Sequence, residues 1–443
     1  MAKLVSQAAT PPRRRGFPVH WAWIVAGASL VVLIGSSGFR ALPSVVMMPM
    51  HREFGWSHGT ISLAIGVNLV VFGITAPFAA ALMERFSIRY VVTGALVLMA
   101  IGSGAPVLSA SPLALVIYWG FLVGIGGGAI ALAYVATLTN RWFAKHRGLV
   151  IGVLTAGGTA GQLVFLPLLA WSSDQFGWRA ASWLVAGAAL IAAPFAYWLV
   201  RDRPADLGLR AYGASDGVAD EDAGLDAVPP TSALRELRLA ARTRVFWWLA
   251  LSFAICGVTT AGLVQTHFIP AAMDHGMPQT TAAGLLALAG VMDIIGTTAS
   301  GWLTDRVDSR VLLAVYYGLR GLSLLLLPVV FAASPTPSML GFIVFYGLDW
   351  IATVPPTIRL CQEHFGAAAG IVFGWMWTAH QFGGAIAAVA AGYLRDYLGG
   401  YTGVWYGAGV ICLLTVVLVL TIPHRPAARR SEPKAEEPRL SQL

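Results

Sequence analysis

The longest stretches of this chain without a charge are far too long to be strands of a soluble protein. Between Tyr90 and Asn140 no Asp, Glu, Lys or Arg occurs. Only 11% of all residues are charged and 57% are hydrophobic, whereas soluble globular chains carry about 25% charged residues. Too little polar surface remains to cover a water-soluble body of 443 residues, which excludes a large soluble α/β enzyme. The sequence predicts an all-α integral membrane protein.

Twelve segments contain the roughly 20 mostly apolar residues that cross a bilayer as a helix. Lipid offers no hydrogen-bond partner to irregular backbone, so each segment is predicted to be helical. Gly and Pro inside these segments, such as Pro355 and Pro356, are expected to be tolerated by close helix packing. The predicted helices span residues 20–49, 58–83, 89–109, 112–140, 147–171, 178–200, 245–272, 279–304, 309–333, 337–362, 367–394 and 400–423.

Composition divides the chain into two six-helix bundles and polar connections. We expect tails at 1–19 and 424–443, bundles at 20–200 and 245–423, and a linker at 201–244. The linker is acidic and rich in Gly, Pro and Ser, which is typical of a solvated segment. Basic residues concentrate on the side of the tails and linker, which predicts that both termini are cytoplasmic. The scarcity of Lys and abundance of Ala and Gly favour a bacterial source and hence a bacterial inner membrane. We expect the protein to be a monomer.

Several classes of function lack their sequence signatures. Cys256, Cys361 and Cys412 lie in apolar segments without metal-ligand spacing, so neither a metal site nor a disulfide framework is implied. The chain has no phosphate-binding loop ending in Gly-Lys-Ser/Thr, and the run Gly126–Gly128 lies inside a predicted helix, where it serves packing. No basic stripe interleaved with aromatic residues suggests nucleic-acid binding. We therefore predict no cofactor, no nucleic-acid partner and no enzymatic activity.

The two halves of the chain repeat each other at an offset of about 221–222 residues. The pattern Glu84-Arg85-x-x-x-Arg89 recurs as Asp305-Arg306-x-x-x-Arg310. Six further residues, namely Phe143, Gly148, Gly152, Gly161, Asp174 and Gly177, align with Phe365, Gly370, Gly374, Gly383, Asp396 and Gly399. Two parallel six-helix repeats with a solute site at mid-membrane between them describe one architecture of secondary transporters.

Three sequence patterns carry a resemblance to a known family. The loop Glu84–Arg89 resembles the acidic-Arg-x-x-x-basic loop of the major facilitator superfamily. Within that superfamily, Arg40–Pro43 with Glu53–Ser57, and Arg141–Leu149 followed by Gly152, resemble the monocarboxylate-porter family. The resemblance covers nearly the whole chain and implies the major facilitator fold.

The resemblance also implies roles for two residues. In the monocarboxylate-porter family a cation on the first helix receives the substrate carboxylate, and Arg40 occupies the matching place. An Asp on the eighth helix takes part in proton coupling, and Asp293 matches it. The family's Arg one turn after that Asp is replaced here by Thr297.

Ionisable groups near mid-bilayer cost about 2.5–3.5 kcal/mol on insertion scales, so they point to function. Arg40 is the main such residue in the first half, where it either snorkels outward or binds an anion. In the second half, Asp293 is either a titrating carboxylate or half of a static ion pair. Arg320 is expected to be a structural partner of Asp293 or Asp349. Through the carboxylate of that partner, it is assigned with Asp293 to proton coupling.

Further site residues complete the hypothesis. Asp349 is equally a structural partner or a cavity residue, and His380 is a proton relay, a substrate donor or a helical His bonded to a neighbour. Tyr134 is a candidate wall of the substrate cavity. State-dependent ion pairs of Glu84 with Arg85 and of Asp305 with Arg306, together with Arg89 and Arg310, are expected to gate the inner face.

These observations favour a secondary active carrier of a small organic anion, a mono- or short-chain carboxylate, coupled to protons in symport. Arg40 would neutralise the anion, and Asp293 would carry the proton. An anion exchanger and an efflux carrier for a hydrophobic compound are the alternatives within transport. A transport-inactive sensor or scaffold would need a sizeable extra domain, which neither the linker nor the tail supplies.

Overall fold

The computed structural model describes residues 20–130, 132–214 and 230–424, which are helical almost throughout. Within these ranges the predicted twelve-helix membrane fold is confirmed, and no β-strand occurs. The first six crossings are α1 (Trp21–Phe54); α2 (His58–Thr75) with α3 (Ala79–Phe86); α4 (Ile88–Gly104); α5 (Pro112–Leu115), a π-helical segment (Val116–Val123), α6 (Gly124–Ala129) and α7 (Leu132–Trp142); α8 (Arg147–Phe176); and α9 (Trp178–Leu199).

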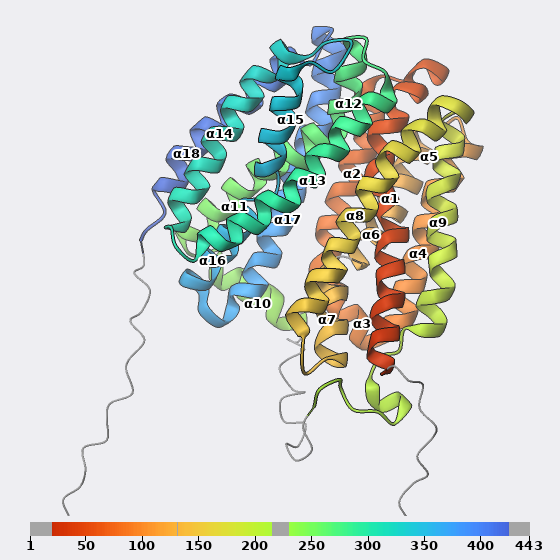
Figure 1. The fold of residues 1–443 in the computed structure, drawn as a ribbon, viewed down its shortest axis with the longest axis vertical. Coiled ribbons are helices and arrows are strands. Elements are labelled where there is room, and N and C mark those ends of the chain that lie inside the picture. The colour runs from red at the N-terminus through yellow and green to blue at the C-terminus, as the bar shows by residue number, and fades with distance from the viewer. Residues whose placement is uncertain (1–19, 131, 215–229, 425–443) are drawn as a thin grey trace, which may run out of the picture.

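The second half of the chain supplies six more crossings (Figure 1). A short helix of the connecting segment, α10 (Pro230–Ala240), precedes them. They are α11 (Arg244–Gly257), a π-helical segment (Val258–Val264) and α12 (Gln265–Asp274); α13 (Gln279–Thr304); α14 (Ser309–Val330); α15 (Pro337–Asp349) with α16 (Val354–Phe365); α17 (Ala369–Leu398); and α18 (Thr402–Leu420).

Capping residues in the sequence explain where several helices begin and end. The side chains of Ser57 and Thr336 accept backbone N–H groups in the first turns of α2 and α15, which satisfies donors that a helix start leaves unpaired. Gly177 and Gly399, which occupy equivalent places in the two repeats, follow α8 and α17 with φ of 83° and 75°. Such positive φ values favour glycine because it lacks a Cβ atom.

Eleven of the twelve crossings are long and apolar enough to span a membrane by length and composition alone. The other is α17, which has 30 residues but is not apolar enough over its length to meet this criterion. Its buried polar side chains include Thr378, His380 and Gln381, and they lie among protein neighbours instead of lipid. Helix α17 therefore crosses between other helices, against α2 and α11.

The tenth crossing differs from the sequence prediction of one continuous helix. Helix α15 ends at Asp349 and α16 begins at Val354, so close packing does not keep the helix intact at Pro355 and Pro356. The two prolines occupy the first turn of α16, where a missing N–H costs no helical hydrogen bond. In the fourth crossing α6 likewise ends, at Ala129, and a turn follows at Ile130.

The helices form two groups, α1 to α9 and α11 to α18, whose ribbons lie side by side (Figure 1). We call the end that carries His20, Asp202, Asp308 and His424 the linker end, and the other the opposite end. After α9 the chain stays with the first group, because Tyr212 pairs its backbone with Trp142 and Phe143. The group contacts concentrate away from the linker end, in pairs of helices α2 with α17, α8 with α13 and α1 with α12.

Glycines spaced seven residues apart let α2 and α17 meet closely. A Cβ atom at Gly59 would lie 2.5 Å from the Tyr393 ring, one at Gly66 would collide with Val389, and one at Gly73 would lie 2.9 Å from the Gln381 Cβ. The space they leave also admits the Thr378 hydroxyl, which donates a 3.0 Å hydrogen bond to the Gly73 carbonyl. Small residues serve the same purpose wherever membrane helices pack without a hydrophobic driving force.

Gly66→Leu is therefore expected to force α2 and α17 apart. Overpacking of a tight contact costs about 1–3 kcal/mol, so the variant should unfold at a lower temperature than the parent protein. The measurement is the thermal unfolding curve of the purified protein in detergent.

Gly94→Leu is the matched control, because a Cβ atom there meets nothing within 4 Å. Its unfolding temperature should equal or exceed that of the parent. Equal behaviour of the two variants would contradict the close approach of α2 and α17.

Candidate functional site

Arg40 lies within α1 and keeps solvent-accessible surface. Its guanidinium carbon lies 5.6 Å from the centre of the Phe39 ring and 5.3 Å from that of Phe72 on α2. No hydrogen bond or ion pair to Arg40 is present among the described residues. Helices α1 and α2 also contact the second group, through α12 and α17, so the guanidinium lies on helices at the boundary between the groups.

Tyr134 on α7 lies away from any accessible space. Its side chain has no exposed surface, and its hydroxyl donates a 2.7 Å hydrogen bond to the Ser29 Oγ on α1. Ser29 in turn donates to the Val25 carbonyl. The phenol thus ties two helices of the first group together in this structure.

The break between α15 and α16 frees backbone groups inside the second group. Pro355 and Pro356 have no N–H, so they cannot bond the carbonyls of Ile351 and Ala352 four residues earlier. The Ser300 hydroxyl on α13 donates a 2.6 Å hydrogen bond to the Ala352 carbonyl. A neighbouring helix therefore supplies the donor that the prolines lack.

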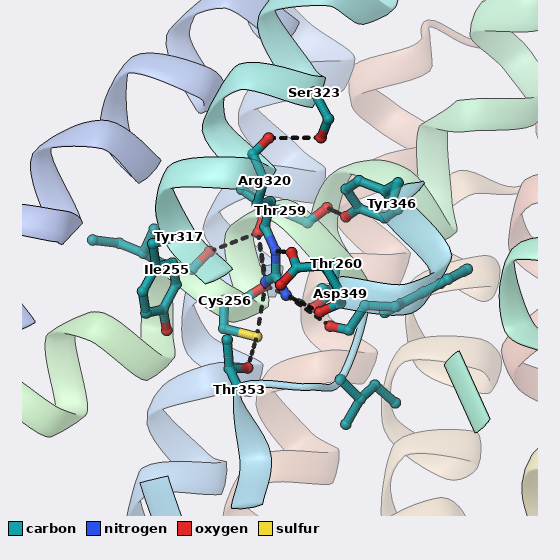
Figure 2. A network of polar contacts seen from close by, with 12 residues as sticks. Ile255, Cys256, Thr259, Thr260, Tyr317, Arg320, Ser323, Tyr346, Asp349 and Thr353 are labelled. Atoms are coloured by element: carbon teal, nitrogen blue, oxygen red, sulfur yellow. Dashed lines mark hydrogen bonds and ion pairs between the residues drawn. The ribbon is translucent and has the colours of Figure 1, made fainter. Parts of the chain in front are cut away.

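Arg320 on α14 binds the other side of this break, and its side chain is fully buried (Figure 2). Its Nη2 donates to the carbonyls of Asp349 and Trp350 at 2.6 and 3.0 Å. Its Nε donates to the Asp349 carboxylate at 2.6 Å. The predicted partnership of Arg320 is thus with Asp349, and the same guanidinium holds the backbone where α15 ends.

Asp293 on α13 has a different set of contacts. Its Oδ1 accepts the Ile351 N–H at 2.9 Å and the Thr297 hydroxyl at 3.0 Å, and only 6% of the residue is exposed. No salt bridge reaches it among the described residues. Thr297, one helical turn later, thus contributes a neutral donor to the carboxylate.

Two parts of this network had no signal in the sequence analysis. Cys256 on α11 lies 3.2 Å from the Arg320 Nη1 and 3.3 Å from the Thr353 hydroxyl (Figure 2). The π-helical segment after α11 presents the Thr259 carbonyl to the Tyr346 hydroxyl, at 2.8 Å. A π-helical turn shifts the hydrogen-bond register and often marks a functional segment, but it leaves no distinct pattern in a single apolar sequence.

His380 on α17 points toward α11 in the second group. Its ring stacks on Trp377, with centres 5.2 Å apart and planes at 8°, and it lies 5.1 Å from the Phe253 ring. The residue is 8% exposed, and its Nδ1 has no hydrogen-bond partner. It neighbours the Arg320 network through Cys256.

The predicted gating residues lie at the linker end, mostly against aromatic rings. Arg85 lies over Phe86, Arg89 over Tyr90, and Arg306 over Trp302 at 4.0 Å. Arg310 pairs with Asp308 at 2.6 Å, and the described contacts contain no ion pair of Asp305 with Arg306. The side chain of Glu84 lies outside the described part of the structure.

Asp202, which follows α9, binds the loop between α3 and α4. It accepts the Ile88 N–H at 2.5 Å and the Ser87 hydroxyl, and so caps the start of α4. Ser87 holds a positive φ of 74° there. An open polar pocket of about 570 Å³ lies beside this cap, lined by Met83, Arg85, Phe86, Ser87, Arg141, Asp202, Arg203 and Asp206.

The described residues thus divide the charges within the membrane-spanning helices into two kinds. Arg320 and Asp349 are bound to each other and to freed backbone, which satisfies a charge pair that is costly to bury. Arg40 lacks an anion, and Asp293 lacks a cation at ion-pair distance. Chemically, the first can receive a carboxylate, and the second can take up a proton. No group of three or more residues able to hold a metal ion occurs within the described ranges.

Arg320→Met tests the structural part of this assignment. Removing one partner of a buried pair leaves the other charge unpaired and costs about 3–5 kcal/mol, and the Trp350 carbonyl loses its side-chain donor as well. We expect a large loss of folded protein, measured by gel filtration and thermal unfolding of membrane extracts.

Arg359→Met is the matched substitution on α16. Arg359 pairs with Glu363 at 3.0 Å with a side chain 42% exposed, and such exposed pairs contribute about 0–1 kcal/mol. A similar loss of folded protein in both variants would argue against the special role of Arg320.

Comparison with known proteins identifies relatives along almost the whole chain. The family model described as Major Facilitator Superfamily matches residues 25–388. The Bacillus subtilis (strain 168) protein named uncharacterized MFS-type transporter YcxA is 27% identical over 395 residues, which cover 86% of this chain and 90% of that protein. The Bos taurus protein named monocarboxylate transporter 13 is 29% identical over 412 residues, covering 91% of this chain and 90% of its own.

Solved structures share the fold at low sequence identity. The nucleoside transporter NupG has a TM-score of 0.70 at 11% identity, covering 91% of this chain and all of its own. A bacterial homologue of the human lysosomal transporter Spinster has a TM-score of 0.67 at 15% identity, covering 91% of this chain and 96% of its own. Together with the family match over most of the sequence, these findings show that the chain belongs to the Major Facilitator Superfamily, as a multi-pass membrane transport protein for a small molecule and not an enzyme.

Proposed function

We propose that this protein carries a small organic anion, a mono- or short-chain carboxylate, across the membrane by alternating access coupled to protons. The observation that carries the proposal is the unpaired guanidinium of Arg40 on helices at the boundary between the two groups. A charge inside a membrane protein without a partner is costly. An anion that arrives with the substrate offsets this cost, and the planar fork of Arg suits a carboxylate.

Relatives support the chemical class of the cargo. Proteins named monocarboxylate transporter 13 and monocarboxylate transporter 11, from Bos taurus and Homo sapiens, are 29% and 27% identical to this chain. Each similarity covers more than nine tenths of this chain. Carboxylates are therefore the first cargo class to test.

Asp293 is the group that we assign to proton coupling. Of the two buried aspartates, Asp349 is committed to Arg320, whose Nε lies 2.6 Å from its carboxylate. Asp293 accepts only neutral donors at hydrogen-bonding distance. A proton on Asp293 would offset the negative charge of the cargo and ease reorientation of the loaded carrier.

Sidedness follows from the basic residues. The tails and the linker end carry most of them, which favours that end as the cytoplasmic side of a bacterial inner membrane. The observed contacts between the two groups then correspond to closure on the outer side. Alternating access requires a second conformation in which these contacts open and contacts at the linker end form, where Arg85, Arg89, Arg306 and Arg310 lie.

Arg40→Ala should abolish transport of the cargo in proteoliposomes. Losing a charge partner of a buried carboxylate costs about 2–5 kcal/mol, so uptake of a radiolabelled short-chain carboxylate should fall at least roughly 30-fold. The cargo is first selected from a panel of acetate, lactate, pyruvate and benzoate by thermal shift.

Arg52→Ala provides the control, because Arg52 is an exposed residue in the last turn of α1. It should transport like the parent. Uptake that survives Arg40→Ala would remove Arg40 from the substrate site.

Asp293→Asn should separate transport from proton drive. The amide oxygen can still accept the Ile351 N–H, but the side chain no longer takes up a proton. Uptake should lose its acceleration by an inward proton gradient, while exchange of labelled for unlabelled cargo continues.

Thr297→Val is the companion variant, since it removes a donor to Asp293 but keeps the carboxylate. It should retain acceleration by the gradient. Gradient-driven uptake that persists in Asp293→Asn would move coupling elsewhere, and a parent protein that exchanges but ignores the gradient would be an anion exchanger.

A further inference from the structure

Asp396 joins the two helix groups at the opposite end by capping a helix of the other group. It lies near the end of α17, and its carboxylate accepts the backbone N–H groups of His58 and Gly59, at 3.2 and 2.8 Å. These residues form the first turn of α2. The His58 Nδ1 lies 2.8 Å from the same carboxylate, and the His58 side chain is only 2% exposed.

The repeat supplies a second contact of the same kind. Asp174, near the end of α8, is the repeat-equivalent of Asp396 and lies near the backbone N–H of Thr280, without the hydrogen bonds that Asp396 forms. Thr280 lies in the first turn of α13 and is itself equivalent to His58 at the same offset of 222 residues. Each group thus extends one aspartate to the start of a helix in its partner group.

The physical effect of each contact depends on the distance between the groups. The first turn of a helix has unpaired N–H donors and the positive end of the helix dipole, and both favour a carboxylate. A carboxylate from the other group can reach them only while the opposite end is closed. The contacts therefore contribute free energy to one conformation and none to the other, which is what shifts a two-state equilibrium.

Neighbouring contacts place these two caps at the point of closure. Gly59 lies against Tyr393, and Gly392 against Ser62 and the His58 carbonyl, so α2 and α17 touch beside Asp396. The His58 ring is held from the other side, with its Nε2 3.3 Å from the Met48 Sδ on α1. Asp396 binds three donors, whereas Asp174 lies near the start of α13 without a hydrogen bond to it, so the two contacts differ in strength.

We infer that Asp396 and Asp174 form a crossed pair of latches that holds the opposite end closed. Neither residue belongs to the gating set predicted at the linker end. The inference depends on the two-group architecture and on no property of the cargo, so it stands or falls separately from the proposed carboxylate transport.

The test measures the distance between the groups at the opposite end in lipid nanodiscs. Spin labels are attached to Ala110→Cys and Ser334→Cys, which lie in exposed loops of the first and second groups; the native Cys256, Cys361 and Cys412 are buried. Asp396→Asn removes the charge and turns an N–H donor toward the α2 start. The ratio of long to short distances should rise about fivefold.

Asp274→Asn is the control, because Asp274 pairs with Arg395 at 2.9 Å inside the second group. Its side chain is 19% exposed, against 26% for Asp396. The control should leave the distance ratio unchanged. Asp174→Asn should raise the ratio less than Asp396→Asn, and the double variant more than either.

Two outcomes would overturn the latch. One is an unchanged ratio in Asp174→Asn and in Asp396→Asn; the other is an equal rise in Asp274→Asn. If Asp396→Asn does not fold, as judged by gel filtration, Asp174→Asn against Asp274→Asn decides the question alone.

Discussion

A peptide group inside a bilayer finds no water, so every N–H or carbonyl released from a helix has to be bonded by another part of the protein. The break between Asp349 and Val354 shows how far this constraint shapes the second helix group. The two prolines leave the Ala352 carbonyl without its helical donor, which Ser300 on α13 replaces. Arg320 on α14 donates to the carbonyls of Asp349 and Trp350 at the end of α15. Ser300 and Arg320 thus lie where the backbone requires them, and Asp349 neutralises the guanidinium that the break needs.

This constraint separates the charges within the membrane-spanning helices into those that the backbone explains and those that it does not. The presence of Arg320 is explained by the two carbonyls and the carboxylate that it binds. Removing it would take a hydrogen-bond donor from each of these groups. Arg40 binds no backbone group, and aromatic rings are its described neighbours. Asp293 accepts one backbone hydrogen bond, from the Ile351 N–H, and the oxygen of an asparagine side chain could accept it equally well. The cost of keeping these two side chains ionisable is therefore not explained by the scaffold.

Much of the fold could be predicted from the sequence because lipid leaves few solutions. Mostly apolar runs of sufficient length predicted all twelve crossings. The offset of about 222 residues predicted two related halves. The interruption of the tenth crossing was within reach, since Pro355 and Pro356 together remove two consecutive donors. It was missed because proline was taken as tolerated wherever helices pack closely.

Partners were harder to predict than positions. Depth along a helix placed Arg320 near both Asp293 and Asp349, and only the rotation of α14 and the break in α15 decide for Asp349. The repeat aligned Asp174 with Asp396, but their partners lie on helices of the other half, more than 100 residues away along the chain. Tyr134 has an aromatic side chain of the kind that lines cavities. Its hydroxyl, however, donates to Ser29, so the side chain points into the interior of the first group.

The repeat also shows which features belong to the scaffold and which to one half alone. Helix α6 ends at Ala129 and is followed by a turn at Ile130, and α15 ends at Asp349, so the fourth and tenth crossings are both interrupted. The positions of Asp293 and Asp349 correspond to Phe72 and Gly127 in the first half, where the interruption exists without charges. A buried carboxylate is therefore not required by the interrupted helix itself. The second half carries the two carboxylates and the first half carries Arg40, which is opposite in sign; the proposed transport of an anion with a proton would use this asymmetry between the halves.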